Sequence, residues 1–410
     1  MKILVQKFGG TSVATRESRE LVYKKIITAK EEGFAVVAVI SAMGRKGEPY
    51  ATDTLLDLIT SDNPKSEPRE LDLIFTCGEI ISGTIVTCNL QGLGYKAKYL
   101  TGLQAGIITT AYYSDARILE IKTEKVKKLL LEGNIVVVAG GQGATLDNEI
   151  TTLGRGGSDT TACSLGVALN AERIEIYTDV EGIMTTDPRI VNEAKLIEKI
   201  SYKVCCEMAY QGAKVMHPRA VEIASLKPKI ELFVRSVFSN NKGTLICDYN
   251  NEPKGGADLL KNIEPVGVAL LTSQIIFVAH SVDVNKKLEL LNIIDNMQQE
   301  IHEIHPETNE IILVLHETSY KEVEKILNEL KISGDWNKGL SKISVVGDNL
   351  DKLQFVALLF STLKNSDIPI IASKCDKNTI STWVKCDKGR DTVKATHQLI
   401  INLGGIKNGM

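Results

Sequence analysis

A lysine, two glycines and two hydroxyl residues come together where the first apolar segment of the chain is predicted to pass from a strand into a helix: Lys7, Gly9, Gly10, Thr11 and Ser12. Glycine lets the backbone approach an anion because no Cβ stands in the way. The free N–H groups of a helix N-terminus, beside a cation, favour phosphate. An ordinary strand-to-helix turn is the alternative, but a lysine at the end of an apolar strand needs a counter-charge. The sequence contains no Gly-x-x-x-x-Gly-Lys-Ser/Thr loop, so this is not a Walker site.

A second glycine-rich stretch, residues 152–161, also leads into a predicted helix. Its Arg155 has a planar guanidinium group that suits a carboxylate or a phosphate. Asp159 falls in the first turn of the helix, where it either caps the helix or holds lysines in place. Helix capping alone would require neither Arg155 nor the surrounding glycines, so we predict a second anion site here.

Three further side chains are candidates for binding a small ligand. Ser41 follows the second buried strand, and ligands of open α/β sheets bind at the carboxyl ends of the strands. Thr52 either contacts the ligand or, with Asp53, caps the next helix. Glu79 lies in an apolar helical stretch, and a buried carboxylate needs a partner. That partner is either a ligand amine or an internal arginine.

The segment 176–189 offers hydroxyls, carboxylates and an arginine within one predicted strand and turn. This mixture suits the base, ribose and phosphates of a nucleotide, and a solvated hairpin is the alternative. Further on, Lys214 precedes a helix that Pro218 should start. For His217 we predict a structural hydrogen-bonding role. The sequence shows no Ser/His/Asp or Cys/His set and no metal-ligand spacing.

Composition narrows the class of protein. The 410 residues carry 48 basic and 51 acidic side chains and a net charge of -3, which gives no reason to expect nucleic acid or an anionic membrane as a partner. The eight cysteines are scattered without a Cys-x-x-Cys, and the adjacent Cys205 and Cys206 are not expected to form a bridge. We therefore expect reduced, mostly buried thiols and a cytoplasmic protein. We see no signal-peptide pattern and no apolar run long enough to span a bilayer.

Strand and helix patterns alternate as far as residue 238. This order predicts an α/β fold with an open, mostly parallel sheet and helices on both faces. Segments 35–41 and 135–140 are continuously apolar, as central parallel strands are when both of their faces are buried. The predicted strands are 3–8, 35–41, 96–100, 135–140, 173–178 and 230–234, and the predicted helices are 16–31, 69–91, 118–132, 157–170 and 217–227.

The C-terminal part of the chain follows a polar segment with Gly and Pro, residues 241–264, which we interpret as a linker. It contains two β-α-β-β-α units, and each needs one more strand to complete a small βαββαβ domain. We predict that residues 265–271 pair with 342–346 to complete the second unit. The resulting domains are 1–240, a first small domain at 272–337, and a second one made of 265–271 plus 338–410. The predicted elements are strands 275–280, 300–305, 309–315, 342–346, 368–373 and 379–385 and helices 285–297, 320–331, 351–365 and 391–402.

The blocks at 7–12, 41–44, 76–79, 152–161, 176–189 and 214–218, in this order, resemble the signature blocks of the aspartokinases, members of the amino-acid kinase superfamily. The two small C-terminal units resemble the tandem ACT domains of that family. The resemblance implies that the 1–240 domain has the amino-acid kinase fold. It also implies ATP-dependent phosphorylation of the side-chain carboxylate of L-aspartate to 4-phospho-L-aspartate, the first step of lysine, threonine, methionine and diaminopimelate biosynthesis, with Mg²⁺ bridging the phosphates of ATP.

The resemblance also implies roles for single residues. Lys7, Asp159 and Lys214 would be catalytic, the lysines neutralising phosphate charge and Asp159 orienting them. The substrate would be bound by Ser41, Thr52, Glu79, Arg155 and Ser158, with Glu79 on its ammonium group and Arg155 on its α-carboxylate. ATP would be bound by Lys7, Gly9, Gly10, Ser12, Thr178, Asp179, Asp187, Arg189 and Lys214. No protein metal ligand is implied.

The ACT-like units depart from the family pattern. In that pattern a Pro-Gly turn joins the first strand to the first helix. The corresponding turns here, residues 281–286 and 347–352, both lack Pro-Gly. Lysine, threonine, diaminopimelate or no effector at all remain open, and pairing of the units predicts a homodimer or a higher homo-oligomer. Two alternatives remain for the function: a kinase of the same superfamily acting on another small acid, and a non-catalytic amino-acid-sensing subunit.

Overall fold

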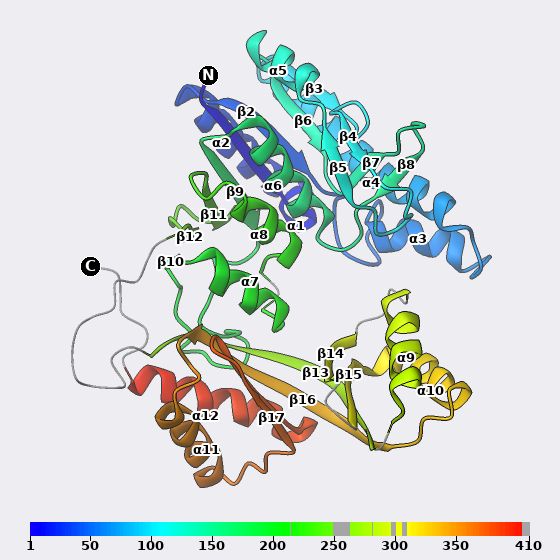
Figure 1. Ribbon diagram of the computed structural model, residues 1–410. Coiled ribbons are helices and arrows are strands. Elements are labelled where there is room, and N and C mark those ends of the chain that lie inside the picture. The colour runs from blue at the N-terminus through cyan, green and yellow to red at the C-terminus, as the bar shows by residue number, and fades with distance from the viewer. Residues whose placement is uncertain (214, 249–262, 281, 297–300, 306–309, 404–410) are drawn as a thin grey trace.

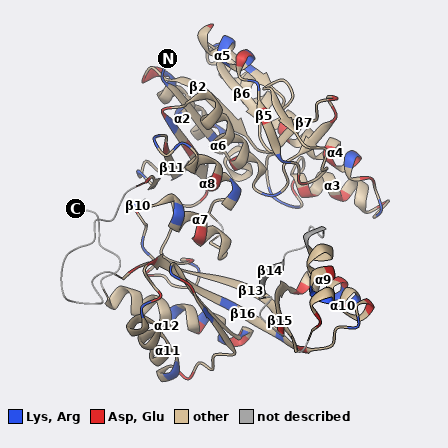
Figure 2. Ribbon diagram, viewed as in Figure 1, with Lys and Arg blue, Asp and Glu red and all other residues tan. Residues whose placement is uncertain are grey.

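The structure is a computed structural model that describes residues 1–213, 215–248, 263–280, 282–296, 301–305 and 310–403. Figure 1 shows an N-terminal part built around one large sheet and a C-terminal part built around another. In the view of Figure 2, acidic and basic residues are interspersed over both parts.

The N-terminal sheet has eight strands in the order β10-β12-β11-β9-β1-β2-β6-β3. Every neighbouring pair is parallel except β11 and β12. This confirms the predicted open, mostly parallel sheet. Its strands are β1 (Ile3–Phe8), β2 (Ala35–Ile40), β3 (Ala97–Leu100), β6 (Ile135–Ala139), β9 (Arg173–Thr178), β10 (Lys199–Ile200), β11 (Glu231–Ser236) and β12 (Thr244–Ile246).

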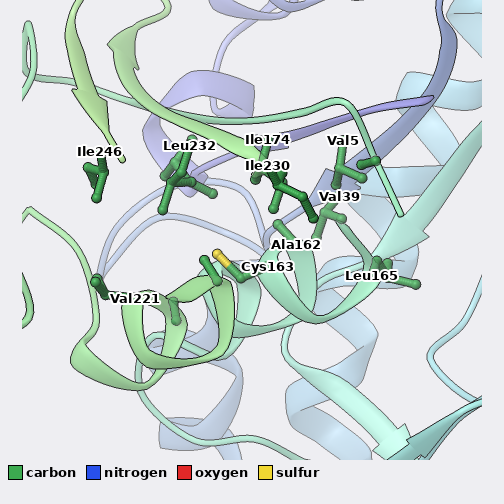
Figure 3. Packing of buried hydrophobic residues seen from close by; sticks show 14 of the residues in the cluster. Val5, Val39, Ala162, Cys163, Leu165, Ile174, Val221, Ile230, Leu232 and Ile246 are labelled. Carbon is green, nitrogen blue, oxygen red and sulfur yellow. The ribbon is translucent and has the colours of Figure 1, made fainter. Parts of the chain in front are cut away.

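Helices cover both faces of this sheet because its central strands are apolar on both sides. Along β1, Leu4 packs into one core with α2 and α4, whereas Val5 packs into the other core with α6 (Figure 3). The strands run toward an edge where α1 and α6 begin, and this edge carries the candidate residues. The helices of this part are α1 (Gly10–Val13), α2 (Arg16–Glu31), α3 (Thr52–Thr60), α4 (Pro68–Gly92), α5 (Glu124–Leu131), α6 (Gly157–Leu169), α7 (Tyr202–Tyr210) and α8 (Pro218–Ser225).

A small four-stranded sheet, which the sequence did not predict, lies beside the large one. Its order is β5-β4-β7-β8, from β4 (Ile107–Thr109), β5 (Ile118–Ile121), β7 (Gln142–Ala144) and β8 (Ile150–Thr152). The prediction of a helix from residue 118 was wrong for its first turn, because β5 pairs antiparallel with β4. That contact between chain segments overrides the local helical pattern.

Helix α4 differs from one expectation. By length and composition it could cross a membrane, although we expected no apolar run of that length, and 44% of its most apolar window is buried inside the structure. Core helices of globular domains pass the same test. Its buried residues include Asp72 and Glu79, which face the site described below.

The C-terminal sheet has the order β14-β15-β13-β16-β18-β17. The predicted pairing of residues 265–271 with 342–346 is confirmed, since Gly267 lies opposite Val346 and Leu271 opposite Lys342. The two small units are nevertheless joined, because two long strands run through both. The strands are β13 (Glu264–His280), β14 (Ile301–His305), β15 (Glu310–His316), β16 (Asp335–Asp348), β17 (Ala372–Cys375) and β18 (Thr379–Lys385).

Each half of the C-terminal sheet has its own helices and core. Phe277 packs with the helices of the first half, and Ile343 and Val345 pack with those of the second. The first half carries α9 (Val284–Asn296) and α10 (Tyr320–Glu329), and the second α11 (Leu353–Asn365) and α12 (Gly389–Asn402). Two short 3₁₀ turns, 317–319 and 386–388, precede α10 and α12.

Two expectations need correction. The 241–264 segment is not linker throughout, because Thr244–Ile246 forms β12 inside the N-terminal sheet; residues 249–262 lie outside the described part. The eight cysteines are free, as predicted, but they are not mostly buried. Four of them, Cys77, Cys88, Cys375 and Cys386, are exposed.

Candidate active site

A cavity of about 560 Å³ opens at the carboxyl ends of β1 and β2, and we call it the central cavity. It collects side chains from the first strand to the start of α6. The sequence-predicted residues that line it are Lys7, Gly10, Ser41, Thr52, Glu79, Arg155, Ser158 and Asp159. Residues that are far apart in the chain therefore meet at one place, as the strand-end argument predicts.

Lys7 and Asp159 form an ion pair on one wall of the cavity. The Lys7 Nζ lies 2.7 Å from the Asp159 Oδ1, and both side chains are largely buried. Strand β1 delivers the lysine, and the first turn of α6 delivers the carboxylate. The N-terminus of α6 has no side-chain cap, so Asp159 is engaged by the lysine rather than by capping. The pair fixes a cation beside the bare backbone at Gly9, whose substituted Cβ would lie 3.5 Å from the Lys7 Nζ.

Glu79 is a buried carboxylate with an unused acceptor. Its Oε1 accepts a hydrogen bond of 3.2 Å from the Ala42 N–H, whereas its buried Oε2 has no hydrogen-bond partner. Burial raises the pKa of Glu79 to about 8. Within the described residues it has no arginine or lysine partner, so the internal-arginine alternative is not supported. The site suits a ligand that supplies a positive charge.

Ser41 and Thr52 stand beside the cation and Glu79 in the cavity wall. The Ser41 N–H donates to the Phe8 carbonyl, and its own carbonyl accepts from the Ser82 hydroxyl, so its backbone is held in place. The residue that caps α3 is Ala51, without a side-chain hydrogen bond. The capping alternative for Thr52 was therefore wrong, and its hydroxyl is available to the cavity.

Asp72 also lines the cavity, and sequence reasoning missed it. It is 2% exposed on α4 and accepts hydrogen bonds from the Thr152 N–H at 2.8 Å, the Thr152 hydroxyl at 2.6 Å and the Ser114 N–H at 3.0 Å. Burial raises its pKa, and these hydrogen bonds oppose the shift. The one signal in the sequence is its spacing from Glu79, because seven residues place both on one helix face.

The turn that carries Arg155 is held from both sides. Asp72 holds Thr152, and Arg219 at the start of α8 donates to the Leu153 carbonyl at 3.0 Å. Gly154 and Gly156 have positive φ of 70° and 68°, which glycine adopts at little cost. Arg155 itself is exposed at the mouth of the cavity.

Four of the residues predicted to bind a nucleotide lie at the end of β9 and in the loop after it: Thr178, Asp179, Asp187 and Arg189. This 178–189 loop does not line the central cavity. Asp179 pairs with Arg45 of the cavity wall at 2.7 Å, and both side chains are exposed. Arg189 pairs with Asp187 on the loop itself, also at 2.7 Å, and its hydrogen bonds lower the pKa of Asp187. Thr178 donates to the Asp179 Oδ1 at 3.2 Å. The Arg45–Asp179 pair joins the loop to the cavity.

For three predicted residues, Ser12, Lys214 and His217, the structure does not show the expected contact. Ser12 is fully buried, its Oγ has no hydrogen-bond partner, and its N–H donates to the Gly9 carbonyl, so its side chain does not reach the cavity. Lys214 lies outside the described residues. The buried Nδ1 of His217 has no hydrogen-bond partner, so the predicted structural hydrogen bond is not seen at that atom, and burial lowers the pKa of His217.

The arrangement has two distinct capacities. Glu79 and Arg155 offer opposite charges to a zwitterion, and Lys7 offers a fixed cation beside glycine backbone to an anion. Within the described residues no group of His, Cys, Asp and Glu could hold a metal ion by itself. Both capacities serve charge neutralisation and the positioning of a ligand.

The chain is similar in sequence and in fold to known proteins. Residues 2–236 match the model of the amino acid kinase family. Aspartokinase 1 of Bacillus subtilis is 40% identical over 402 residues, covering 97% of this chain and 98% of that protein. Among solved structures, E. coli aspartokinase III with aspartate and ADP superposes with a TM-score of 0.81 at 23% identity, over 98% of this chain and 100% of that one. The same enzyme with lysine and aspartate gives 0.72 at 24%, with the same coverage. These two structural likenesses show the fold.

Proposed function

The chain belongs to the aspartokinases of the amino acid kinase family, and on that premise we propose that it transfers the γ-phosphoryl group of ATP to the side-chain carboxylate of L-aspartate. A carboxylate oxygen attacks the γ-phosphorus, the bond to the β–γ bridging oxygen breaks, and ADP leaves with 4-phospho-L-aspartate as the product. The carboxylate is already ionised at neutral pH, so the reaction requires no general base.

The acceptor amino acid fits the central cavity through its charges. Glu79 accepts the ammonium group at its unpartnered Oε2, and Arg155 binds the α-carboxylate from the mouth. Ser41, Thr52 and Ser158 donate to the carboxylate that attacks. An α-amino acid with a second carboxylate satisfies all of these groups, whereas a simple carboxylic acid would leave Glu79 without a counter-charge.

The transferred phosphoryl group meets the fixed cation. Lys7, oriented by Asp159, neutralises charge that grows on the phosphoryl oxygens, and Lys214 is proposed to do the same. Mg²⁺ enters with its substrate as the MgATP complex. The backbone around Gly9, Gly10 and Ser12 holds the phosphates, and the nucleotide contacts Thr178, Asp179, Asp187 and Arg189.

The proposal rests above all on one observation: a carboxylate with an unpartnered buried oxygen and a lysine–aspartate pair line the same cavity. The test is ATP- and Mg²⁺-dependent acyl phosphate formation, trapped as the hydroxamate. Aspartyl hydroxamate is the expected product. Product from glutamate or carbamate instead would keep the phosphate site and replace the substrate. No product from any acid, with nucleotide still bound, would favour a sensing subunit.

We further propose that the chain is a cytoplasmic homodimer or higher homo-oligomer that assembles through its ACT-like sheet. An amino-acid effector is part of this proposal, because an E. coli relative of the same fold has been crystallised with lysine. Lysine, threonine and diaminopimelate added to the hydroxamate assay discriminate between effectors. Inhibition by none of them would indicate that the altered loops serve assembly only.

A further inference from the structure

The 178–189 loop is hydrogen-bonded to the C-terminal part of the chain through a residue near the middle of the loop. The Thr185 Oγ1 lies 2.9 Å from the His397 Nε2, and the two residues are 0% and 2% exposed. Thr185 belongs to the loop proposed to bind nucleotide, and His397 belongs to α12 of the second ACT-like half. Breaking a hydrogen bond between two buried polar groups costs free energy, because neither group can bind water in its place.

The same stretch has further contacts with the C-terminal sheet. The Val268 N–H of β13 donates to the Thr185 carbonyl at 2.8 Å. Val191, just after the loop, is buried in the core formed by β16, α11 and α12. The pKa of Asp187 is lowered mainly by its hydrogen bond from Arg189, and the charge of Arg390 on α12 adds to this lowering. The loop is therefore supported by the C-terminal part over most of its second half.

The hydroxyl of Thr185 makes two hydrogen-bonding contacts, one within the N-terminal part and one with α12. It accepts from the Lys195 N–H at 3.0 Å, which ties the loop to the segment that follows it. A hydroxyl has one hydrogen and two acceptor positions, so it can also bond His397 in either tautomer. Loss of the imidazole would leave this hydroxyl with the Lys195 contact alone, and the loop without its side-chain tie to α12.

We propose that His397 is a positioning residue for nucleotide binding: through Thr185 it holds the 178–189 loop in the conformation that binds ATP. The inference rests on the proposed assignment of this loop to the nucleotide. Among the described residues, those that line the central cavity fall between Lys7 and Asp159, outside the 178–189 loop. We therefore expect aspartate binding not to depend on this contact. Nucleotide affinity and acceptor affinity should then respond differently to changes in α12.

The test compares His397→Ala with Thr379→Val in the full-length protein. The Thr379 hydroxyl donates to the Glu207 Oε1 at 2.8 Å and thus also joins the C-terminal sheet to the N-terminal part, but on α7 and away from the loop. We expect His397→Ala to raise the KM for ATP and the Kd for ADP about three- to tenfold, the effect of one buried hydrogen bond. The KM for aspartate should stay within about twofold. Thr379→Val should leave both constants unchanged.

Rescue separates positioning from folding. His397→Gln keeps an amide that can bond the Thr185 hydroxyl and should restore most of the nucleotide affinity, and Thr185→Ser should behave like the native protein. Equal rises in both KM values, or an unchanged Kd for ADP in a folded His397→Ala protein, would overturn the proposal. If the native protein makes no aspartyl hydroxamate but ADP binding still depends on His397, the aspartokinase reaction fails while the positioning role stands.

Discussion

The central cavity and the 178–189 loop are the two regions for which we propose a function, and they are supported in different ways. The described residues that line the cavity fall between Lys7 and Asp159 and belong to the N-terminal part. The loop is held by β13 and α12 of the C-terminal part through Thr185. The proposed acceptor site is therefore supported within the N-terminal part, whereas the loop proposed to bind nucleotide also depends on contacts with the C-terminal part.

The largest effect on turnover is expected from Lys7, the cation proposed to contact the phosphoryl group between the central cavity and the nucleotide. Lys7→Ala should lower kcat about 10³–10⁵-fold, the range for charge-stabilising groups in phosphoryl transfer, with smaller changes in both KM values. Hydroxamate formation under saturating substrates measures this. Lys2→Ala, which removes an exposed lysine near the start of the same strand, is the control and should be neutral. Near-normal turnover of Lys7→Ala would rule out the proposed phosphate site.

The cavity has its own pH signature. Because burial raises the pKa of Glu79 to about 8, the empty site holds this group protonated below that pH, and only the carboxylate attracts an ammonium group. kcat/KM for aspartate should therefore rise about tenfold per pH unit up to roughly pH 8 and then level off. kcat/KM for ATP should not show this rise with pH. Glu79→Gln should abolish the rise for aspartate and weaken aspartate binding; a rise that persists in that variant would assign the titration to another group.

Asp72 tests whether the cavity wall acts independently of the loop. In Asp72→Asn an amide group replaces a carboxylate that accepts from Thr152 and Ser114, so the turn that carries Arg155 loses about 1–3 kcal/mol of support. The KM for aspartate should rise and the KM for ATP should change little. Glu70→Gln, on the exposed first turn of the same helix, is the matched control. A rise confined to ATP would contradict the separation of the two regions.

The smallest effect is expected at the ion pair that joins them. Arg45 and Asp179 are both exposed, and such pairs couple by about 0–1 kcal/mol. A double-mutant cycle of Arg45→Ala and Asp179→Ala, measured as kcat/KM for ATP at low and high salt, should give a small coupling that salt removes. A coupling several times larger would mean that the cavity and the loop move as one unit.

The sequence and the structure agree best where local chemistry is decisive. The glycine turns, Lys7 and Arg155 were recognised because they stand at a strand end or before a helix start, where residue type is informative. Glu79 was recognised because a carboxylate in an apolar helical stretch needs a partner. Asp72 was not, because a carboxylate on a helix gains its role only when Thr152 and Ser114 are brought to it by the fold. The small sheet was missed for the same reason, since β5 is a strand only beside β4.

The sequence by itself determined the alternation of strands and helices and the two glycine-rich turns, because periodicity and residue type act over a few neighbours. It also predicted the pairing of residues 265–271 with 342–346, because each small unit lacks one strand of its βαββαβ pattern. Only the tertiary structure decided that β13 and β16 run through both small units, and that His397 and Thr185, 212 positions apart, share a hydrogen bond. Burial removes water from such groups, so their partners are chosen by packing, and packing is set by the whole chain.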